Sequence, residues 1–191
     1  MNTLPEIKAK LKSGGVVILP TETVYGIAAR ADNTNAIRRI YDVKGRNFDK
    51  PLAVCVDGIR QAQTLAHFNS LAIKLAEQFW PGPLTLILPA IDKALHARCY
   101  QGDTIALRCP DIDWRDALTH TPLALTSANK SGEPDALTAR IDLPVDAILD
   151  GGAVSGGMPS TIIKIDGSAI TLLREGALSM NAFTGYDVKL S

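Results

Sequence analysis

Several short polar segments of this chain combine hydroxyl, charged and glycine residues in patterns suited to an anionic ligand. The first is Pro20–Gly26, which reads PTETVYG and directly follows an apolar run at Val16–Leu19. The apolar run predicts a buried strand, so the polar groups after it are expected at the strand's carboxyl end, where open α/β sheets bind ligands. Threonine and glycine are also common turn residues, so a purely structural turn is the alternative.

A cationic segment follows a predicted helix. It reads Lys44-Gly45-Arg46, and Lys50 comes four residues after the arginine. Cations at a helix C-terminus often only complement the helix dipole, which is one interpretation. The other is a polyphosphate clamp, because glycine lets the backbone bend closely around a ligand while the flanking side chains reach different oxygens.

Two further loops are rich in small polar residues. Thr126–Gly132 reads TSANKSG, and its serine and asparagine could donate to phosphate or ribose oxygens or could cap a helix. Gly152 and Gly157 have the glycine spacing of a P-loop, but Met158 and Pro159 stand where lysine and serine or threonine are required. The sequence therefore excludes a Walker A site, and it contains no GxGxxG motif.

The charges balance overall but not locally. The 191 residues include 20 basic and 20 acidic side chains, which is unlike a dedicated nucleic-acid binder. Residues 30–50 hold six cations against three anions, whereas residues 133–150 hold five anions against one cation. This asymmetry favours one anion-binding cleft over a long basic track.

Other patterns exclude further classes. The cysteines Cys55, Cys99 and Cys109 form no Cys-x-x-Cys pair, so neither a disulfide framework nor a zinc site is expected. The histidines are scattered and have no elbow motif beside them, which disfavours a hydrolase triad. No apolar run approaches the roughly 18 residues of a membrane span, and the first 20 residues lack the order of a signal peptide, so a cytoplasmic protein is expected.

Helical and strand patterns alternate along most of the chain. Helices are expected at 4–11 behind Thr3, at 35–43 and at 70–79, and strands at 16–19, 52–56 and 84–88. Short apolar runs at 104–107, 123–126 and 147–149 extend the predicted sheet, and 161–165 with 170–173 predict a hairpin around Asp166–Ala169. Together these patterns predict one layered α/β domain with a mixed sheet.

Six motifs occur in order along the chain: PTETVYG at 20–26, KGR at 44–46 with KPL at 50–52, WPGPLT at 80–85, SAN at 127–129, STI at 160–162 and LREG at 173–176. Together they closely resemble the YrdC-like family, the threonylcarbamoyl-AMP synthases. The resemblance runs from about residue 5 to residue 180. Each motif alone is weak, whereas the ordered set is specific.

The resemblance implies a fold and a domain organisation. The fold is α/β, an open twisted mixed parallel/antiparallel sheet with flanking helices around a basic concave cavity. Residues 1–180 would form the YrdC-like domain and residues 181–191 a C-terminal tail, without the extra domain of the longer family branch. A single-domain member of the family is therefore expected.

The resemblance also implies a reaction. L-threonine, bicarbonate or CO2, and ATP with Mg2+ as its cofactor would give threonylcarbamoyl-AMP and pyrophosphate. A separate transferase complex would place the threonylcarbamoyl group on the adenosine beside the anticodon of tRNA. No membrane contact is expected, and direct tRNA binding stays open at this point.

Carried over residue by residue, the resemblance assigns roles to ten positions. Catalytic roles are implied for Lys44 and Arg46. ATP binding is implied for Arg46, Lys50, Thr104, Ser127, Asn129 and Arg174, and L-threonine binding for Thr23, Arg108 and Ser160. Arg108 would take the carboxylate of threonine. Such chemistry needs charge stabilisation and alignment rather than a protein nucleophile, which agrees with the absence of a triad motif.

Two positions depart from the family pattern. Asn47 stands where relatives usually carry proline, so the loop between Arg46 and Lys50 is expected to be less rigid. Cys55 stands where many relatives have a histidine that contacts threonine. The contact at this position is therefore open.

Two alternatives to a threonylcarbamoyl-AMP synthase remain. The first is a non-catalytic relative that binds RNA in the same cavity, which the zero net charge disfavours. The second is a carbamoyl-adenylate domain that serves a different acceptor, for which this chain offers no fused catalytic domain.

Overall fold

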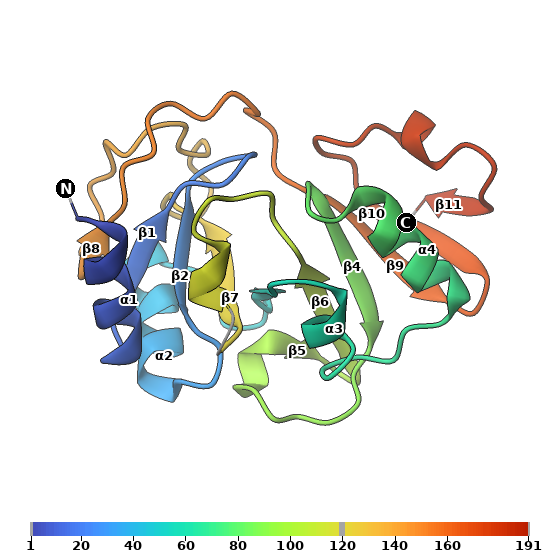
Figure 1. Cartoon of the computed structure of the whole chain (residues 1–191), viewed down its shortest axis with the longest axis horizontal. Helices are drawn as coiled ribbons and strands as arrows, with labels where there is room; N and C mark the ends of the chain where they lie inside the picture. The colour runs from blue at the N-terminus through green and yellow to red at the C-terminus, as the bar shows by residue number, and fades with distance from the viewer. Residues whose placement is uncertain (1, 119–120, 191) are drawn as a thin grey trace.

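The computed structural model describes residues 2–118 and 121–190, and it forms one strongly twisted mixed sheet with helices on its faces (Figure 1). The strand order is β11-β10-β9-β4-β6-β3-β7-β2-β1-β8, and β5 pairs with β6 beside this path. The α/β class and the mixed sheet are thus confirmed. No helix in the described residues is both long and apolar enough to span a membrane.

The helices are α1 (Leu4–Lys12), α2 (Thr34–Lys44), α3 (Ile59–Ala62) and α4 (Ser70–Phe79), with 3-10 turns η1 (Ala97–Cys99), η2 (Arg115–Leu118) and η3 (Met180–Phe183). The strands are β1 (Val17–Leu19), β2 (Gly26–Arg30), β3 (Ala53–Cys55), β4 (Leu84–Pro89), β5 (Tyr100–Gln101), β6 (Thr104–Arg108), β7 (Leu123–Ser127), β8 (Ala147–Ile148), β9 (Thr161–Asp166), β10 (Ala169–Arg174) and β11 (Val188–Leu190).

The three predicted helices are confirmed, and their caps explain their bounds. Glu6 accepts from the Thr3 backbone N–H at 2.7 Å at the start of α1. Asn33 Oδ1 accepts from the Ala36 backbone N–H at 2.9 Å at the start of α2. Gly45 ends α2 in the left-handed region with φ 59°, a conformation that glycine adopts without strain. The chain therefore turns sharply between Lys44 and Arg46.

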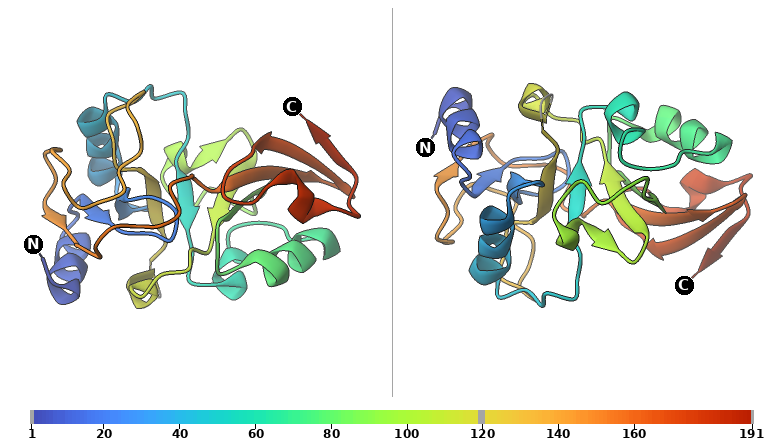
Figure 2. Two further views of the ribbon diagram at one scale, coloured as in Figure 1. Left: turned by 90° about the horizontal axis from the view of Figure 1, so that it is seen from above. Right: turned by 90° about the horizontal axis from the view of Figure 1, so that it is seen from below.

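The two helices nearest the N-terminus cover opposite faces of the sheet (Figure 2). Ile7 and Leu11 of α1 pack with Val17 and Leu19 of β1. The buried face of α2 includes Ile37 and Ile40. Both belong to the hydrophobic cluster that contains Ile18, the β1 residue between Val17 and Leu19. Successive side chains of a strand point to opposite faces, so β1 is buried on both sides, as its unbroken apolar run predicts.

All eight predicted strands are present, but three others carry no clear pattern in the sequence. These three are β2, β5 and β11. β2 reads GIAAR, so small residues replace the alternating pattern that signals a strand. Gly26 packs closely against β7, and a Cβ there would come within 2.9 Å of the Leu125 side chain, which would have to shift. β1 and β2 pair antiparallel, so Pro20–Tyr25 is the turn of a hairpin.

The predicted C-terminal hairpin is confirmed, and the chain after it joins the sheet. β9 and β10 pair antiparallel, and Gly167 at their turn has φ 57°. β11 adds to β10 in parallel, and Phe183 of η3 is 1% exposed. The described residues assigned above to a tail, 181–190, thus pack onto the sheet edge (red in Figure 1). The proposed domain boundary at residue 180 stays a prediction.

Candidate functional site

A cavity of about 360 Å³ lies over the middle of the sheet. Its floor follows from strand alternation and register. Leu84, Leu86 and Leu88 of β4 are buried in the core, whereas Thr85 and Ile87 between them line the cavity. The neighbouring strands contribute in the same way: β3 gives Ala53 and Cys55, β6 gives Ala106 and Arg108, β7 gives Leu125 and Ser127, and β9 gives Ile162.

The pairing register sorts this floor into a polar row and an apolar row. Cys55 is paired with Arg108 between β3 and β6, and Ile87 is paired with Ala106 between β4 and β6. The polar row therefore contains Cys55 and Arg108, and Ile87 and Ala106 lie in the apolar row, whereas Thr85 of β4 is paired with Ile162 of β9. Turns and strand ends provide the remaining lining side chains, which are Thr21, Thr23, Val24, Arg46, Pro51, Gln101, Thr126, Asp135, Pro159, Ser160, Leu173 and Arg174.

Arg108 is the most tightly held cation of this cavity. The residue is 5% exposed, and its Nη2 lies 2.8 Å from Glu22 Oε1 and donates to Thr23 Oγ1 at 3.1 Å. Nε donates to the carbonyl of Gly82 at 3.3 Å, which gives the 80–84 turn a role beside the site. Three partners from two loops thus fix the orientation of the Arg108 guanidinium, and Nη1 makes none of these contacts.

Glu22 is a site residue whose role sequence reasoning missed. It belongs to the PTETVYG segment, and only its pairing across the fold with Arg108 reveals its position. Both carboxylate oxygens are buried, and Oε2 has no donor among the described residues. Glu22 consequently neutralises Arg108 from the side of the PTETVYG turn.

Hydroxyl groups surround this ion pair. Thr21 Oγ1 and Thr23 Oγ1 are 2.9 Å apart, and Thr85 Oγ1 and Ser160 Oγ are 2.8 Å apart. Arg174 Nη2 donates to the Ser160 carbonyl at 2.7 Å and lies 3.2 Å from Ser160 Oγ. Burial lowers the pKa of Arg174, but an arginine stays charged at neutral pH. The turn after β1, the start of β9 and the end of β10 therefore meet here.

Lys44 is buried outside the cavity, and the catalytic role predicted for it stays a prediction. It is 3% exposed and does not line the cavity. Its Nζ donates to the carbonyls of Ser127 and Asn129, the latter at 2.6 Å, and to Asn129 Oδ1 at 2.9 Å. Burial and the nearby Arg46 lower the pKa of Lys44 to about 8, so the ammonium form still dominates at pH 7. All three donors of Lys44 hold the loop after β7.

The other cations of this segment divide between cavity and surface. Arg46 lines the cavity, and its Nη2 donates to the Pro51 carbonyl at 3.0 Å. The Lys50 side chain is exposed and does not line the cavity, while its carbonyl accepts from Tyr41 Oη at 2.8 Å. Gly45 thus separates a buried lysine from an arginine that faces the cavity.

Six of the ten predicted site residues line this one cavity. They are Thr23, Arg46, Arg108, Ser127, Ser160 and Arg174. Lys44, Lys50, Thr104 and Asn129 do not line it. Thr104 Oγ1 donates to the Gln101 carbonyl at 2.8 Å, and Asn129 accepts from Ser127 Oγ at 2.6 Å. Gln101 lines the cavity in place of Thr104.

The cavity also contains one carboxylate, Asp135, which sequence reasoning counted only within an acidic segment. Its expected attraction for anions stays a prediction, because Asp135 and Glu22 oppose the three arginines that line it. Other acids of the same segment lie elsewhere, and Asp146 pairs with Arg39 at 2.7 Å. The local charge asymmetry of the sequence is therefore partly cancelled in space.

The three cysteines are free and buried. Burial raises the pKa of Cys55 to about 12, that of Cys99 to about 12 and that of Cys109 to about 11. Each thiol is therefore protonated at neutral pH and is a poor nucleophile and metal ligand. Cys55 presents a small neutral group to the cavity beside Arg108. No group of three or more His, Cys, Asp and Glu side chains in the described residues could hold a metal.

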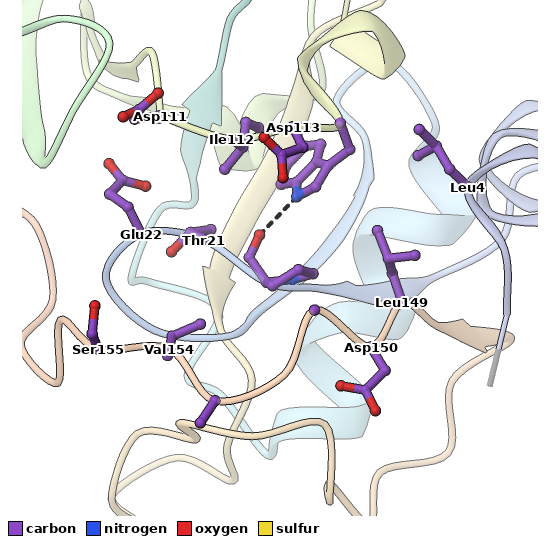
Figure 3. A pocket seen from close by; sticks show the side chains of 14 residues that line it. Leu4, Thr21, Glu22, Asp111, Ile112, Asp113, Leu149, Asp150, Val154 and Ser155 are labelled. Carbon is purple, nitrogen blue, oxygen red and sulfur yellow. Dashed lines mark hydrogen bonds between the residues drawn. The ribbon is translucent and has the colours of Figure 1, made fainter.

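A second cavity of about 490 Å³ lies on the other side of the PTETVYG turn. Thr21 lines both cavities, and Glu22 lines this second one. The carboxylates of Glu22 and Asp111 lie on the same side of it (Figure 3). Trp114 Nε1 donates to the Pro20 carbonyl at 2.7 Å and anchors the start of the turn.

Comparison with known proteins gives one consistent family. The model of the Sua5/YciO/YrdC family, described as "Telomere recombination", matches residues 9–176. A putative threonylcarbamoyl-AMP synthase of Methanocaldococcus jannaschii is 38% identical over 180 residues, which cover 90% of this chain and 84% of that one. The threonylcarbamoyl-AMP synthase of Bacillus subtilis is 39% identical over 186 residues, which cover 92% of this chain and 54% of that one.

A solved structure of a relative agrees with the fold throughout. P. abyssi Sua5 complexed with L-threonine has a TM-score of 0.89 and 33% identity, and the match covers 97% of this chain and 58% of that chain. The chain therefore spans little more than half the length of this relative and of the B. subtilis one.

The contacts of Lys44 predict a loss of stability that does not depend on any ligand. Lys44→Met should lower the free energy of unfolding by about 2–4 kcal/mol, because it removes three hydrogen bonds to the Ser127 carbonyl, the Asn129 carbonyl and Asn129 Oδ1, of which only the last also accepts from Ser127 Oγ. Urea denaturation measures the change. Lys130→Met in the same loop removes an exposed lysine and is the control, with an expected change within about 0.5 kcal/mol. Equal effects of the two substitutions would contradict the buried role of Lys44.

The contact between Glu22 and Arg108 predicts a second loss of stability. Glu22→Ala should cost about 2–3 kcal/mol, because it leaves the Arg108 guanidinium, 7% exposed in its side chain, without its anionic partner. Glu22→Gln keeps an oxygen acceptor and should cost less. The measurement is again urea denaturation, and an unchanged unfolding midpoint for Glu22→Ala would refute this role.

Proposed function

The chain belongs to the Sua5/YciO/YrdC family, and on that premise we propose that it is a nucleotidyltransferase that makes threonylcarbamoyl-AMP. Its substrates are L-threonine, bicarbonate or CO2, and ATP. One observation carries the proposal: Arg108, which suits a carboxylate, shares a cavity with Arg46 and Arg174, which suit phosphates. The curated relatives named threonylcarbamoyl-AMP synthase support it.

The proposed reaction has two steps. The neutral amine of threonine attacks CO2, forms an N–C bond and loses a proton, which gives a carbamate. A carbamate oxygen then attacks the α-phosphorus of ATP, and the bond from that phosphorus to the β-phosphate bridging oxygen breaks, so that its electron pair leaves with pyrophosphate. No protein nucleophile takes part, so the site must align the reactants and stabilise negative charge.

The polar row of the cavity suits the amino-acid end of the reaction. Arg108 binds the threonine carboxylate through the face left free by Glu22 and Thr23. The paired hydroxyls of Thr85 and Ser160 lie in the same region and offer donors and acceptors to the threonine hydroxyl or carbamate. Cys55, small and uncharged, leaves room for the side chain.

The part of the cavity lined by Arg46, Ser127 and Arg174 suits the nucleotide, and Arg174 also borders the amino-acid end because it contacts Ser160. Arg46 and Arg174 contact phosphate oxygens, and Ser127 donates from the loop after β7. Lys44 and Asn129 act through this loop, because their side-chain contacts keep Ser127 in place. Lys50 and Thr104 lie outside the cavity, so they contact ATP only after a rearrangement.

Mg2+ is proposed to arrive on ATP rather than in a protein cage. This arrangement is usual for the ion, which keeps several waters and binds one or two carboxylates together with substrate phosphates. The cavity fits it because a carboxylate and phosphate-binding arginines line the same space. Bound to the triphosphate, the ion offsets its negative charge.

The product would be the donor for a separate transferase complex that modifies the adenosine beside the anticodon of tRNA, and this use on tRNA supports a cytoplasmic location. Direct tRNA binding is a weaker proposal, because Glu22 and Asp135 place negative charge at the cavity where RNA phosphates would bind. Tight tRNA binding that weakens steeply with salt, without turnover of ATP, would instead favour a non-catalytic RNA-binding relative.

Incubating the protein with ATP, L-threonine, bicarbonate and Mg2+ tests the proposal directly. Threonine-dependent release of pyrophosphate and formation of a threonylcarbamoyl adenylate are expected. Their absence would overturn the proposed function.

Because Arg46 lines the cavity, its replacement is expected to cause a large loss of activity in this assay. Arg46→Ala should lower kcat/KM about 30- to 900-fold, since removing one preorganised donor costs about 2–4 kcal/mol of transition-state stabilisation. Arg60→Ala is the matched control, because Arg60 is an exposed arginine on α3 that does not line the cavity. If Arg46→Ala retained full activity, Arg46 would have no role in catalysis.

The end of the cavity assigned to the amino acid predicts that the protein binds L-threonine in preference to L-serine. L-threonine with ATP should stabilise the protein against heat more than L-serine with ATP, because one methyl group in a closed pocket contributes about 1–3 kcal/mol of discrimination. A thermal-shift titration then gives an apparent affinity about 5- to 150-fold higher for L-threonine. Equal shifts with the two amino acids would show that the cavity does not recognise the methyl group.

A further inference from the structure

Asp135 is the one charged side chain lining the cavity to which the proposed roles assign no specific contact. It lies in the segment after the Ser127–Asn129 loop, and its side chain lines the cavity together with Arg46, Arg174 and Ser127. Among the described side chains that line the cavity, it is the only carboxylate. A carboxylate in a cavity that receives a triphosphate would repel the ligand, so its presence needs a physical reason.

The Asp135 carboxylate is half-buried and has no partner in the described parts of the chain. No hydrogen bond or ion pair holds it. Other aspartates of this protein are satisfied by arginine, as Asp32 is by Arg30 at 2.7 Å. The carboxylate is nonetheless near the site's cations, because its charge raises the pKa of Lys44 and of Arg174 against the effect of burial. Asp135 thus offers free oxygen ligands beside the groups assigned to phosphate.

We propose that Asp135 is the protein ligand of the Mg2+ that accompanies ATP. The inference rests on the proposed function, because it takes the nucleotide to lie between Arg46 and Arg174. Mg2+ is a hard cation that prefers carboxylate, phosphate and water oxygens, and a single protein carboxylate is sufficient when phosphates complete its shell. The ion would attract both the Asp135 carboxylate and the triphosphate and would thereby offset their mutual repulsion.

The proposed arrangement predicts that neutralising Asp135 changes the nucleotide affinity in opposite directions with and without the metal ion. In EDTA the Asp135 carboxylate opposes the nucleotide, so its neutralisation should strengthen binding. In Mg2+ the same carboxylate holds the ion, so its neutralisation should weaken binding. A carboxylate that accepted hydrogen bonds from the ribose hydroxyls would instead strengthen binding equally in both conditions.

The test uses a nucleotide that cannot react, α,β-methylene-ATP, and isothermal titration calorimetry with Mg2+ or with EDTA. For the natural protein, Mg2+ should raise the affinity at least about tenfold. For Asp135→Asn, the affinity in EDTA should equal or exceed that of the natural protein, and the gain from Mg2+ should fall to about twofold or less. Glu133→Gln is the matched control, because Glu133 is an exposed carboxylate two residues away.

A direct readout of the metal separates coordination from a general charge effect. With Mn2+ in place of Mg2+, electron paramagnetic resonance should show tighter binding of the ion in the complex of natural protein and nucleotide than in the Asp135→Asn complex. Glu133→Gln should behave as the natural protein does. An unchanged Mn2+ affinity in Asp135→Asn, or equal losses in Mg2+ and EDTA, would overturn the proposal, as would a loss that 2′-deoxy nucleotide reproduces in the natural protein.

The outcomes also separate this inference from the proposed function. Nucleotide binding with the expected metal dependence but no threonylcarbamoyl adenylate would leave the Asp135 site intact and overturn the proposed reaction. Adenylate formation with an unaltered metal dependence in Asp135→Asn would retain the reaction and overturn the Asp135 site. A protein that binds no nucleotide would overturn both.

Discussion

The buried ammonium of Lys44 is the contact on which the site depends. It joins the last residue of α2 to the carbonyls of Ser127 and Asn129 at the end of β7. A buried cation with all three donors satisfied by oxygen atoms can remain charged, and removing any partner would leave a costly unpaired group. Through this contact the rim that carries Arg46 and the loop that carries Ser127 and leads to Asp135 keep a fixed separation.

Strand alternation then determines what faces the ligand. Leucine residues of β4 enter the core, whereas Thr85 and Ile87 face the cavity, and the neighbouring strands follow the same rule. Register places Cys55 beside Arg108 and Ile87 beside Ala106, whereas Thr85 lies beside Ile162. One cavity floor can therefore present both polar and apolar side chains without any additional element.

The electrostatics of the cavity are more balanced than its arginines suggest. The Glu22 carboxylate lies 2.8 Å from the Arg108 guanidinium and neutralises its charge. The negative charge of Asp135 lines the same cavity as the positive charges of Arg46 and Arg174. A site of this kind favours a ligand that brings both an anion and a cation, such as a zwitterionic amino acid or a nucleotide with its metal ion. It is poorly suited to the uniform phosphate chain of a nucleic acid.

The sequence by itself determined the three predicted helices, eight of the strands and the mixed sheet, because periodicity, caps and turn residues act locally, and its ordered motifs identified six residues of the cavity through the resemblance to the family. The small residues of β2 gave no alternating signal, so that strand emerged only when its partners were in place. Tertiary structure alone decided that Lys44 is buried, that Glu22 faces Arg108 and that Asp135 shares a cavity with Arg46. Each of these depends on contacts between residues more than 35 positions apart, or on which side of a turn a side chain points, and local patterns carry no information about either.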